Sequence, residues 1–302
     1  MSSNKLLKHA YLIIAHNQFE LLEKLILLLD DERNDIYIHI DKKVMDFNFE
    51  NFLNMTKKSN VYFIDREDVN WGGYTLVNVE MMLLKAAIQY NYEYYHLISG
   101  VDLPIKTQDE IHSFFTKNKG KEFVHFDSLN LSSEEYNRVK YYYFVQDKIS
   151  SKNPMKTFFR RLEILGVKLQ KIININRIKD LNIKLGKGAQ WFSITNNFAK
   201  YIIENETLIE DIFKYGNCVD EMFVQTILLN SKFKDNLYYK NFDNNYKSIL
   251  RYIDWERGKP YIFKRSDYNQ LMSSEHLFAR KFDLNKDSEI INKIFVRLSG
   301  GE

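Results

Sequence analysis

Two short charged motifs of opposite sign contain the side chains best suited to chemistry. Asp220 and Glu221 stand at the start of an apolar stretch with helical spacing, VDEMFVQTILL. An acidic first turn stabilises a helix, because the helix N-terminus carries partial positive charge, and Asp220 fits the position of an N-cap. Alternatively, Glu221 points into a cleft and acts as a general base. The motif by itself leaves both interpretations open.

The second motif is the basic pair Arg280 and Lys281 within EHLFARKFD, with Arg251, Arg257 and Lys259 upstream. Adjacent basic residues between apolar ones are often solvated side chains at the end of a helix. They can instead hold a diphosphate, because a guanidinium binds phosphate oxygens through two parallel N–H groups and an ammonium adds a compact positive charge. The pair is therefore compatible with an anion site.

Side chains that can contact a sugar form a third group. Aromatic residues make up 15% of the chain, and its three tryptophans are candidate stacking platforms: Trp71, Trp191 and Trp255. Trp71 is the best placed of them because it precedes two glycines in a predicted loop, and core packing is the alternative. Asp102, directly before Leu-Pro, either forms a turn or accepts a hydrogen bond from a sugar hydroxyl.

Motifs of several other enzyme classes are absent from the sequence. It has no GxGxxG, Walker A, HExxH or GxSxG motif. It also has no Asp-x-Asp, the pattern with which many nucleotide-sugar transferases hold a divalent cation. Its seven histidines never occur at metal-ligand spacing in a helix, and His39 and His96 fall within predicted strands as expected core residues. Zinc enzymes and nucleophilic hydrolases are disfavoured, and we expect neither a metal nor another cofactor.

Length and composition indicate a globular protein. The 302 residues are 45% hydrophobic and 27% charged, a profile that excludes a fibrous or disordered chain. The single cysteine, Cys218, excludes an intramolecular disulfide and is typical of a reducing compartment. No apolar run approaches the ~20 residues that span a bilayer, and no Ala-x-Ala-type cleavage site follows the N-terminus. We expect a soluble cytoplasmic protein.

Positive charge is concentrated in residues 148–187. The whole chain has a formal net charge of +3, yet this segment has 11 Lys and Arg against only Glu163 and Asp180. Apolar residues recur there at spacings of four and three, which predicts an amphipathic helix: Phe158, Leu162, Leu165, Leu169 and Ile172. We expect this helix to pack on the core with a solvated basic face. The alternatives are attraction to an anionic membrane surface or a polyanionic acceptor, and no motif supports nucleic acid.

The elements that must position these side chains alternate between strand and helix. Short apolar runs predict strands at 11–15, 35–40, 61–64, 94–99, 122–125 and 190–195. Helical periodicity predicts helices at 19–29, 76–89, 108–116, 196–205 and 219–229. This order favours a single α/β domain, 1–302, with helices on the faces of a sheet and the basic helix inserted.

In such sheets, ligands bind at the carboxyl ends of the strands, so the site is expected in the loops that follow them. Those loops contain His16-Asn17, Asp41-Lys42-Lys43, Asp65-Arg66 and Gly100-Val101-Asp102. We therefore divide the domain into a nucleotide-binding half, 9–130, the basic helical insertion, 148–187, and an acceptor and catalytic half, 188–285.

Four ordered blocks resemble the core-2/I-branching β-1,6-N-acetylglucosaminyltransferases and the related peptide O-xylosyltransferases. They are AYLIIAHNQFELLEKLI with IYIHIDKK, VNWGGYTLVNVEMM with YYHLISGVDLPIKTQDEI, CVDEMFVQTILLNS, and LRYIDW followed by SSEHLFARKFD, over roughly residues 9–285. The resemblance implies a GT-A-like fold with a mixed central sheet, and inverting, metal-independent transfer from a UDP-sugar. Animal members have a membrane anchor, a stem and disulfides that this sequence does not show, so we expect a bacterial, cytoplasmic member.

The resemblance also implies roles for individual residues. Glu221 corresponds to the catalytic base, and Asp41 and the segment around His16 correspond to nucleotide contacts. The implied diphosphate clamp consists of Arg280 and Lys281, to which the xylosyltransferase branch adds Arg251.

Two parts of this sequence depart from the family pattern. In the branching enzymes another clamp arginine lies about two dozen residues before the C-terminal pair, where this sequence has Gly258 between Arg257 and Lys259. The resemblance implies Lys259 in the clamp, with Arg257 as the alternative. The acceptor region is the least similar, and the residues expected there are Trp71, Asp102, Trp191 and Asp220.

Elementary chemistry is in line with this set of residues. A departing UDP develops negative charge, which preorganised Arg and Lys stabilise in a water-poor cleft without a cation. Inversion then needs one carboxylate to take the proton of the acceptor hydroxyl as its oxygen attacks the anomeric carbon.

The expected function is transfer of GlcNAc from UDP-GlcNAc to a hydroxyl of a glycan acceptor, free or lipid-linked, in bacterial surface polysaccharide synthesis. Alternatives are UDP-xylose, UDP-glucose or UDP-galactose as donor, a non-catalytic nucleotide- or glycan-binding module, and a scaffold held at the inner face of the cell membrane through 148–187.

Overall fold

The central sheet of the protein is mixed. The computed structural model describes residues 8–149 and 153–300. Six strands lie in the order β3-β2-β1-β4-β7-β6. Four neighbours are parallel: β3 (Asn60–Phe63), β2 (Asn34–Ile40), β1 (His9–Ala15) and β4 (Tyr94–Ser99). β7 (Phe192–Thr195) runs antiparallel to β4, and β6 (Phe123–Val124) runs antiparallel to β7. A mixed α/β sheet is what the resemblance implied.

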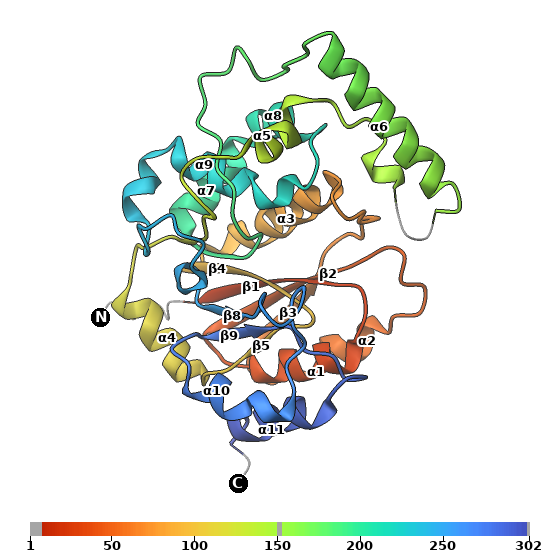
Figure 1. Ribbon diagram of the computed structural model, residues 1–302. Helices are drawn as coiled ribbons and strands as arrows, with labels where there is room; N and C mark the ends of the chain where they lie inside the picture. The colour runs from red at the N-terminus through yellow and green to blue at the C-terminus, as the bar shows by residue number, and fades with distance from the viewer. Residues whose placement is uncertain (1–7, 150–152, 301–302) are drawn as a thin grey trace.

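Helices cover both faces of this sheet (Figure 1). One face carries α3 (Thr75–Ala87), α7 (Asn196–Glu204), α8 (Glu206–Phe213) and α9 (Phe223–Leu229), and the other carries α1 (Phe19–Leu28), α4 (Gln108–Lys117), α10 (Tyr268–Ser273) and α11 (Ser288–Leu298). Side chains of β1 alternate between them: Leu12 belongs to the first core, and Tyr11 and Ile13 belong to the second. Because both faces are buried, the strands are almost wholly apolar, which made them predictable.

A second, three-stranded sheet brings the C-terminal segment to the end of β4. It has the order β5-β9-β8, from β5 (Leu103–Pro104), β9 (Phe278–Arg280) and β8 (Arg251–Ile253). β9 pairs with β8 in parallel and with β5 antiparallel. Because β5 follows β4 after only three residues, this pairing places Arg280 beside the loop after β4.

Most predicted elements are present, with shifted ends. The strand expected at 190–195 begins at Phe192, and the strand expected at 122–125 is limited to Phe123–Val124. The helix expected at 219–229 is a 3-10 turn, η3 (Val219–Glu221), followed by α9. The sequence patterns missed the helices α8, α10 and α11 and the strands β5, β8 and β9. They also missed α2 (Phe49–Leu53), α5 (Ser133–Lys140) and the 3-10 turns η1 (Ile88–Tyr90), η2 (Gln146–Lys148), η4 (Lys232–Asn236), η5 (Tyr246–Ser248) and η6 (Arg265–Asp267).

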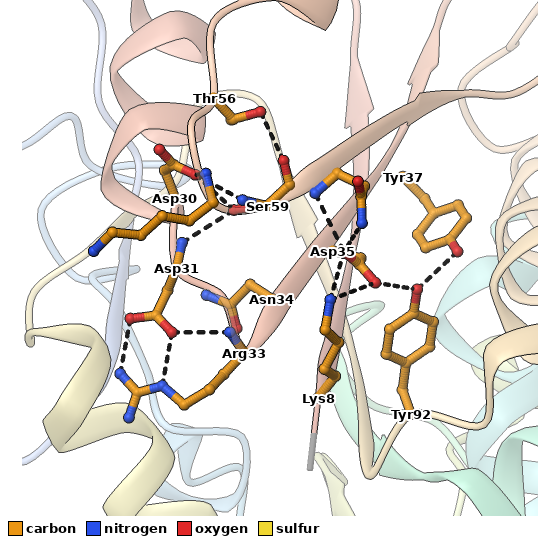
Figure 2. A network of polar contacts seen from close by, with 12 residues as sticks. Lys8, Asp30, Asp31, Arg33, Asn34, Asp35, Tyr37, Thr56, Ser59 and Tyr92 are labelled. Atoms are coloured by element: carbon orange, nitrogen blue, oxygen red, sulfur yellow. Dashed lines mark hydrogen bonds and ion pairs between the residues drawn. The ribbon is translucent and has the colours of Figure 1, made fainter. Parts of the chain in front are cut away.

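The amino edge of the sheet is held by a saturated polar network (Figure 2). Asp30 accepts the backbone N–H groups of residues 57, 58 and 59 at 2.8–2.9 Å. Asp35 accepts from Lys8 Nζ at 3.3 Å, from the side chain of Asn60 at 2.9 Å and from the Tyr92 hydroxyl at 2.7 Å. These contacts join the starts of β2 and β3 to the loops before them, so the charged residues here have structural partners.

The histidines of the strands are structural, as expected. His39 is buried in β2, and its Nε2 accepts the Glu67 N–H at 2.9 Å. His96 is buried in β4, where its ring nitrogens lie 2.8 Å from Ser193 Oγ and 3.1 Å from His9 Nδ1.

The predicted basic helix is α6 (Lys156–Ile172), but the expected packing of its apolar face on the core is wrong. The five residues of the predicted stripe are 45–74% exposed: Phe158, Leu162, Leu165, Leu169 and Ile172. Glu163 is instead the buried side chain, and its Oε2 accepts the Val145 N–H at 2.9 Å. Periodicity showed the stripe correctly, whereas polar anchors decide which side of the helix meets the protein. Lys152 of the same segment lies outside the described residues.

In the described part of the chain, no helix is both long enough and apolar enough to cross a membrane.

Candidate active site

A hollow of about 480 Å³, open to solvent, lies at the carboxyl edge of the central sheet. Its walls are residues 14–18 at the end of β1, 99–101 at the end of β4, and 280–283 after β9. This is the edge where the strand order predicted a site.

Arg280 is fixed at this hollow by a buried carboxylate. Its Nη1 donates to Asp102 Oδ1 at 2.8 Å and also to Ser99 Oγ, and its guanidinium lies 4.5 Å above the Trp191 ring. Asp102 is 2% exposed and also accepts the Ser99 N–H at 2.9 Å and the Ser99 hydroxyl at 2.7 Å. Among the described residues, no hydrogen bond uses Nε or Nη2 of Arg280, so these donors remain for a ligand.

Asp102 and Trp191 therefore have positions that differ from the expected sugar contacts. Asp102 belongs to the tight turn after β4, where its carboxylate is taken up by Ser99 and Arg280. Trp191 is largely buried, with its ring face beneath the guanidinium. Both side chains position Arg280, and a cation held between a carboxylate and an aromatic ring needs little rearrangement to bind an anion.

Lys281, His16 and Asp41 lie around the same edge. Lys281 and His16 line the hollow, and His16 is exposed at its rim. Partial desolvation lowers the pKa of His16, and the nearby charges of Lys281, Arg280 and Lys43 act in the same direction, while Asp41 opposes them. Asp41 is buried at the end of β2 and accepts the Lys43 N–H at 2.8 Å. The structure thus brings together four of the six residues predicted for the nucleotide.

Arg251 does not join them, in contrast to the role that the resemblance implied. It is 2% exposed, and its guanidinium donates to the carbonyl oxygens of Leu97 at 3.2 Å and Phe192 at 3.0 Å and to the Ser193 hydroxyl. Burial lowers its pKa to about 10. These bonds tie β8 to the carboxyl end of the central sheet, so Arg251 supports the fold beneath the hollow.

Lys259 and Arg257 are also outside the lining of the hollow. Lys259 is exposed on the segment that follows β8. Arg257 forms ion pairs with Asp254 at 2.5 Å and Asp267 at 2.8 Å, and its guanidinium lies 4.0 Å from the Tyr261 ring. Neither alternative for the additional clamp residue reaches the site in this conformation.

A second charged centre surrounds Glu221. The side chain is 39% exposed, and its Oε2 accepts from Arg138 Nη1 of α5 at 2.8 Å and lies 4.0 Å from Lys187 Nζ. Arg138 also reaches the Cys218 carbonyl at 3.4 Å, and Lys187 pairs with Asp127. No hydrogen bond within the described residues uses Glu221 Oε1, which leaves this oxygen open to an acceptor.

Asp220 lies within η3 and is buried, so it is neither an N-cap nor an exposed sugar contact. No side-chain cap bond is present at η3 or at α9. Burial raises the pKa of Asp220 to about 7, with the charge of Glu221 adding to the shift. Buried Glu80 of α3 lies nearby, and desolvation, followed by the charge of Asp220, raises its pKa well above the usual range. Burial thus favours the protonated form of both acids.

One short segment connects the two charged centres. The Gly188 N–H donates to the Glu221 carbonyl at 2.9 Å, and Trp191 lies beneath Arg280. Three residues of chain span about 11 Å at most, because consecutive Cα atoms are about 3.8 Å apart. Gly188 itself has no room for a side chain, since a Cβ would lie 1.8 Å from the His125 carbonyl oxygen. The base candidate and the cation thus contact opposite ends of the segment 188–191.

A second pocket of about 600 Å³, open to solvent, is lined by Arg138, the partner of Glu221. It is formed by α5, α6 and the turn at 217–218, and its walls include Asn137, Arg138, Tyr141 and Lys171. Because Arg138 both lines this pocket and bonds Glu221, a molecule bound there lies beside the carboxylate.

Two exposed tryptophans lie at separate places on the surface. Trp71 is 82% exposed, and the Gly72 carbonyl beside it accepts the Cys218 N–H at 2.8 Å, so this loop adjoins the turn before Glu221. Trp255 is half-exposed, with its ring 6.4 Å from that of Tyr246. Trp71 is therefore no core residue, which favours the stacking alternative.

Several residues of these centres carried no recognisable sequence signal. Arg138 and Lys187 are separated from Glu221 by 83 and 34 positions, and neither belongs to a motif. Gln18 lines the hollow, where it donates to Asp283 at 3.0 Å and accepts the Leu284 N–H at 3.1 Å. Ser99 was the nearest to being found, because it directly precedes the quoted Gly-Val-Asp.

Within residues 8–149 and 153–300, no group of three or more His, Cys, Asp or Glu side chains is arranged to hold a metal ion. Metal-independent chemistry stays a prediction.

Comparison with known proteins gives consistent matches. The family model for the core-2/I-branching enzymes matches residues 9–276. A human β-1,3-galactosyl-O-glycosyl-glycoprotein β-1,6-N-acetylglucosaminyltransferase is 24% identical over 92% of this chain, and rat xylosyltransferase 2 is 22% identical over 99%. The alignments cover 66% of the human protein and 34% of the rat protein, so the chain spans about two thirds and one third of their lengths. A solved structure, apo mouse xyloside xylosyltransferase 1, aligns at a TM-score of 0.36 with 10% identity, over 90% of this chain and 96% of that one.

Proposed function

This chain belongs to the core-2/I-branching enzyme family, and from that premise we propose that it transfers a sugar from a UDP-sugar to a hydroxyl of a glycan acceptor. The observation that carries the proposal is the pairing of a preorganised cation, Arg280, with an open carboxylate, Glu221, through the segment 188–191. We also propose a GT-A-like fold, on the strength of family membership and the mixed sheet.

The donor diphosphate binds at the carboxyl edge of the sheet. Arg280 offers its free Nε and Nη2 groups, Lys281 adds a second positive charge, and His16 and Asp41 lie on the nucleotide side of the hollow. As the bond to the sugar breaks, the electron pair passes to the UDP oxygen, and these cations stabilise the charge that develops. The proposal therefore needs no divalent cation.

Glu221 acts as the general base. Its Oε1 takes the proton of the acceptor hydroxyl, the hydroxyl oxygen bonds to the anomeric carbon, and UDP leaves from the opposite face. One displacement of this kind inverts the configuration and gives a β-linked product from an α-linked donor. Arg138 holds the other oxygen of Glu221, which orients the carboxylate toward the acceptor.

We place GlcNAc first among the donor sugars, with a β-1,6 linkage, because the human relative bears that activity in its name. Xylose comes second, because several xylosyltransferases align over as much of this chain. UDP-glucose and UDP-galactose are the remaining donors to screen. As acceptor we propose a cytoplasmic precursor of a bacterial surface polysaccharide.

Calorimetric titration of UDP tests the donor site. We expect micromolar binding in EDTA and the same affinity in Mn²⁺, because Arg280 and Lys281 replace the metal. Binding that requires Mn²⁺ would contradict metal independence, and no binding in either buffer would contradict a UDP-sugar donor. UDP binding without transfer from any of the four donors to a mixed glycan library would favour the alternative of a nucleotide-binding module.

A further inference from the structure

The proposed chemistry does not use the exposed apolar face of α6. The stripe contains five of its side chains, and two further exposed apolar residues flank it: Met155 and Ile173. None of the apolar side chains of α6 belongs to either core of the described protein. Contiguous apolar surface of this kind marks an interaction site in a soluble protein.

The folded protein fixes the direction of this face. Glu163 and Gln170 point inward, where Glu163 accepts the Val145 N–H, and Gln170 accepts the Tyr142 N–H and donates to the Tyr142 carbonyl, both at 2.8 Å. α6 lies at the periphery of the molecule, away from the central sheet (Figure 1). Polar bonds on the inner side thus turn the apolar side outward, the reverse of an ordinary surface helix.

The exposed surface of α6 is also positively charged. The helix has five basic residues, Lys156, Arg160, Arg161, Lys168 and Lys171, and one acid, Glu163. Because that acid is buried against residue 145, no carboxylate of α6 offsets these charges at the surface. On the helical wheel, Arg161 and Lys168 flank the apolar stripe directly, at 100° per residue.

We propose that α6 lies in the interface of an anionic lipid bilayer, parallel to its surface. The stripe enters the boundary between headgroups and acyl chains, and the flanking Arg and Lys side chains contact the acidic headgroups. Aromatic and leucine side chains beside cations are the composition of interfacial helices. Its length and charge fit a helix lying on a membrane.

A second copy of this chain fits the same face less well. A two-fold contact through the stripe brings Arg161 and Lys168, which flank it, near the same residues of the partner, with no surface acid on either helix to compensate. An anionic surface supplies the opposite charge at every point.

Membrane docking has a consequence for the acceptor, which rests on the proposed function. Val167 and Lys171 of α6 form one wall of the pocket that also contains Arg138, the partner of Glu221. A protein lying on α6 holds this pocket beside the bilayer, so the matching acceptor is a glycan carried on a lipid.

Flotation of the full chain with vesicles tests the docking independently of turnover. The probes are vesicles of phosphatidylcholine alone and of equal parts phosphatidylcholine and phosphatidylglycerol. We expect flotation only with the anionic vesicles, and weaker flotation as salt shortens the Debye length from about 8 Å at 0.15 M to about 3 Å at 1 M.

Three variants locate the contact. Leu162→Gln with Leu165→Gln and Leu169→Gln should lower vesicle affinity more than about 100-fold, because three leucines lose their burial. Arg161→Gln with Lys168→Gln should lower it roughly 30-fold, equivalent to about 1 kcal/mol for each basic residue. Matched controls alter exposed residues elsewhere and should leave flotation unchanged: Leu27→Gln with Leu53→Gln and Val296→Gln, and Lys57→Gln with Lys58→Gln.

Circular dichroism and UDP affinity establish that each variant is folded. Absence of flotation by the unaltered chain overturns the proposal, as does flotation that survives the triple leucine substitution. Concentration-dependent dimers that the same substitution dissociates would assign the face to a second copy, and this also overturns docking on lipid.

Discussion

The two edges of the central sheet both concentrate charged side chains, yet they are built in opposite ways. At the amino edge, the oxygens of Asp30 and Asp35 are taken up by backbone N–H groups and by neighbouring side chains (Figure 2). At the carboxyl edge, Arg280 and Glu221 each have one side bonded and the other side free. Partial satisfaction, more than charge itself, separates a binding site from a structural cluster.

The substitution with the largest expected effect is Glu221→Gln. Loss of the general base should lower kcat by about 10²- to 10⁴-fold, while the dissociation constant of UDP stays unchanged. Steady-state kinetics and calorimetry measure the two quantities. Glu204→Gln, an exposed acid of α7 that lines neither pocket, is the matched control and should keep full turnover. Undiminished transfer by Glu221→Gln would show that the open carboxylate is not the general base.

Arg280→Ala should weaken UDP binding by about 10- to 100-fold, because a hydrogen bond to a charged group is worth roughly 1.5–3 kcal/mol. Lys281→Ala should have a smaller effect of the same sign. Calorimetric titration gives both values, with Lys117→Ala on the distant α4 as a control. Equal UDP affinity in Arg280→Ala would mean that the half-satisfied guanidinium is only structural, like the charges of the amino edge.

Asp30→Ala, at the amino edge, should lower the stability of the protein and leave its activity unchanged. Three backbone N–H groups lose their acceptor, so the free energy of unfolding should fall by about 1–3 kcal/mol. UDP affinity and kcat should be unchanged in the folded protein. Urea denaturation measures the first quantity, and a change in kcat at constant fold would break the division between the two edges.

Acidity should affect the two edges in opposite directions. Hydrogen bonds from Arg33 lower the pKa of Asp31 to about 2, so its contribution to stability is present above pH 3.8 and is lost as the pH falls toward 2. The pKa of buried Asp220 is raised to about 7, so the folded protein keeps a proton that the unfolded chain releases near pH 4. Stability from this group therefore falls as the pH rises from about 4 to about 7.

Asp220→Asn isolates the second effect. The variant should unfold at a higher temperature than the unaltered protein at pH 8 and at a similar temperature at pH 4. At pH 8 the gain in the free energy of unfolding should be on the order of a few kcal/mol. Melting curves at the two pH values provide the comparison. A variant that is destabilised equally at both would show that Asp220 is ionised and bonded in the folded protein.

The sequence patterns predicted what depends on neighbouring residues. Buried parallel strands are continuous apolar runs, so β1, β2 and β4 could be located, and with them the edge that holds His16, Asp41 and Asp102. Arg280, Lys281 and Glu221 were found in short charged motifs of neighbouring residues.

Residues whose roles depend on distant partners could not be predicted. Arg138 meets Glu221 across 83 positions, and nothing in SSEEYNRVK indicates that contact. Arg251 resembles a phosphate-binding residue in the sequence. A strand with one cation has the same pattern whether its guanidinium binds a phosphate or the backbone carbonyl groups of the protein. Periodicity likewise defined the stripe of α6 but contains no information on the inward bonds of Glu163 and Gln170.

Those few inward bonds make α6 an accessory to the fold. Since the helix adds no apolar side chain to either core, its sequence can drift, lengthen or be replaced at little cost to folding. Changes on its outward face, away from the pocket wall formed by Val167 and Lys171, can therefore alter which surface the protein contacts without altering the fold.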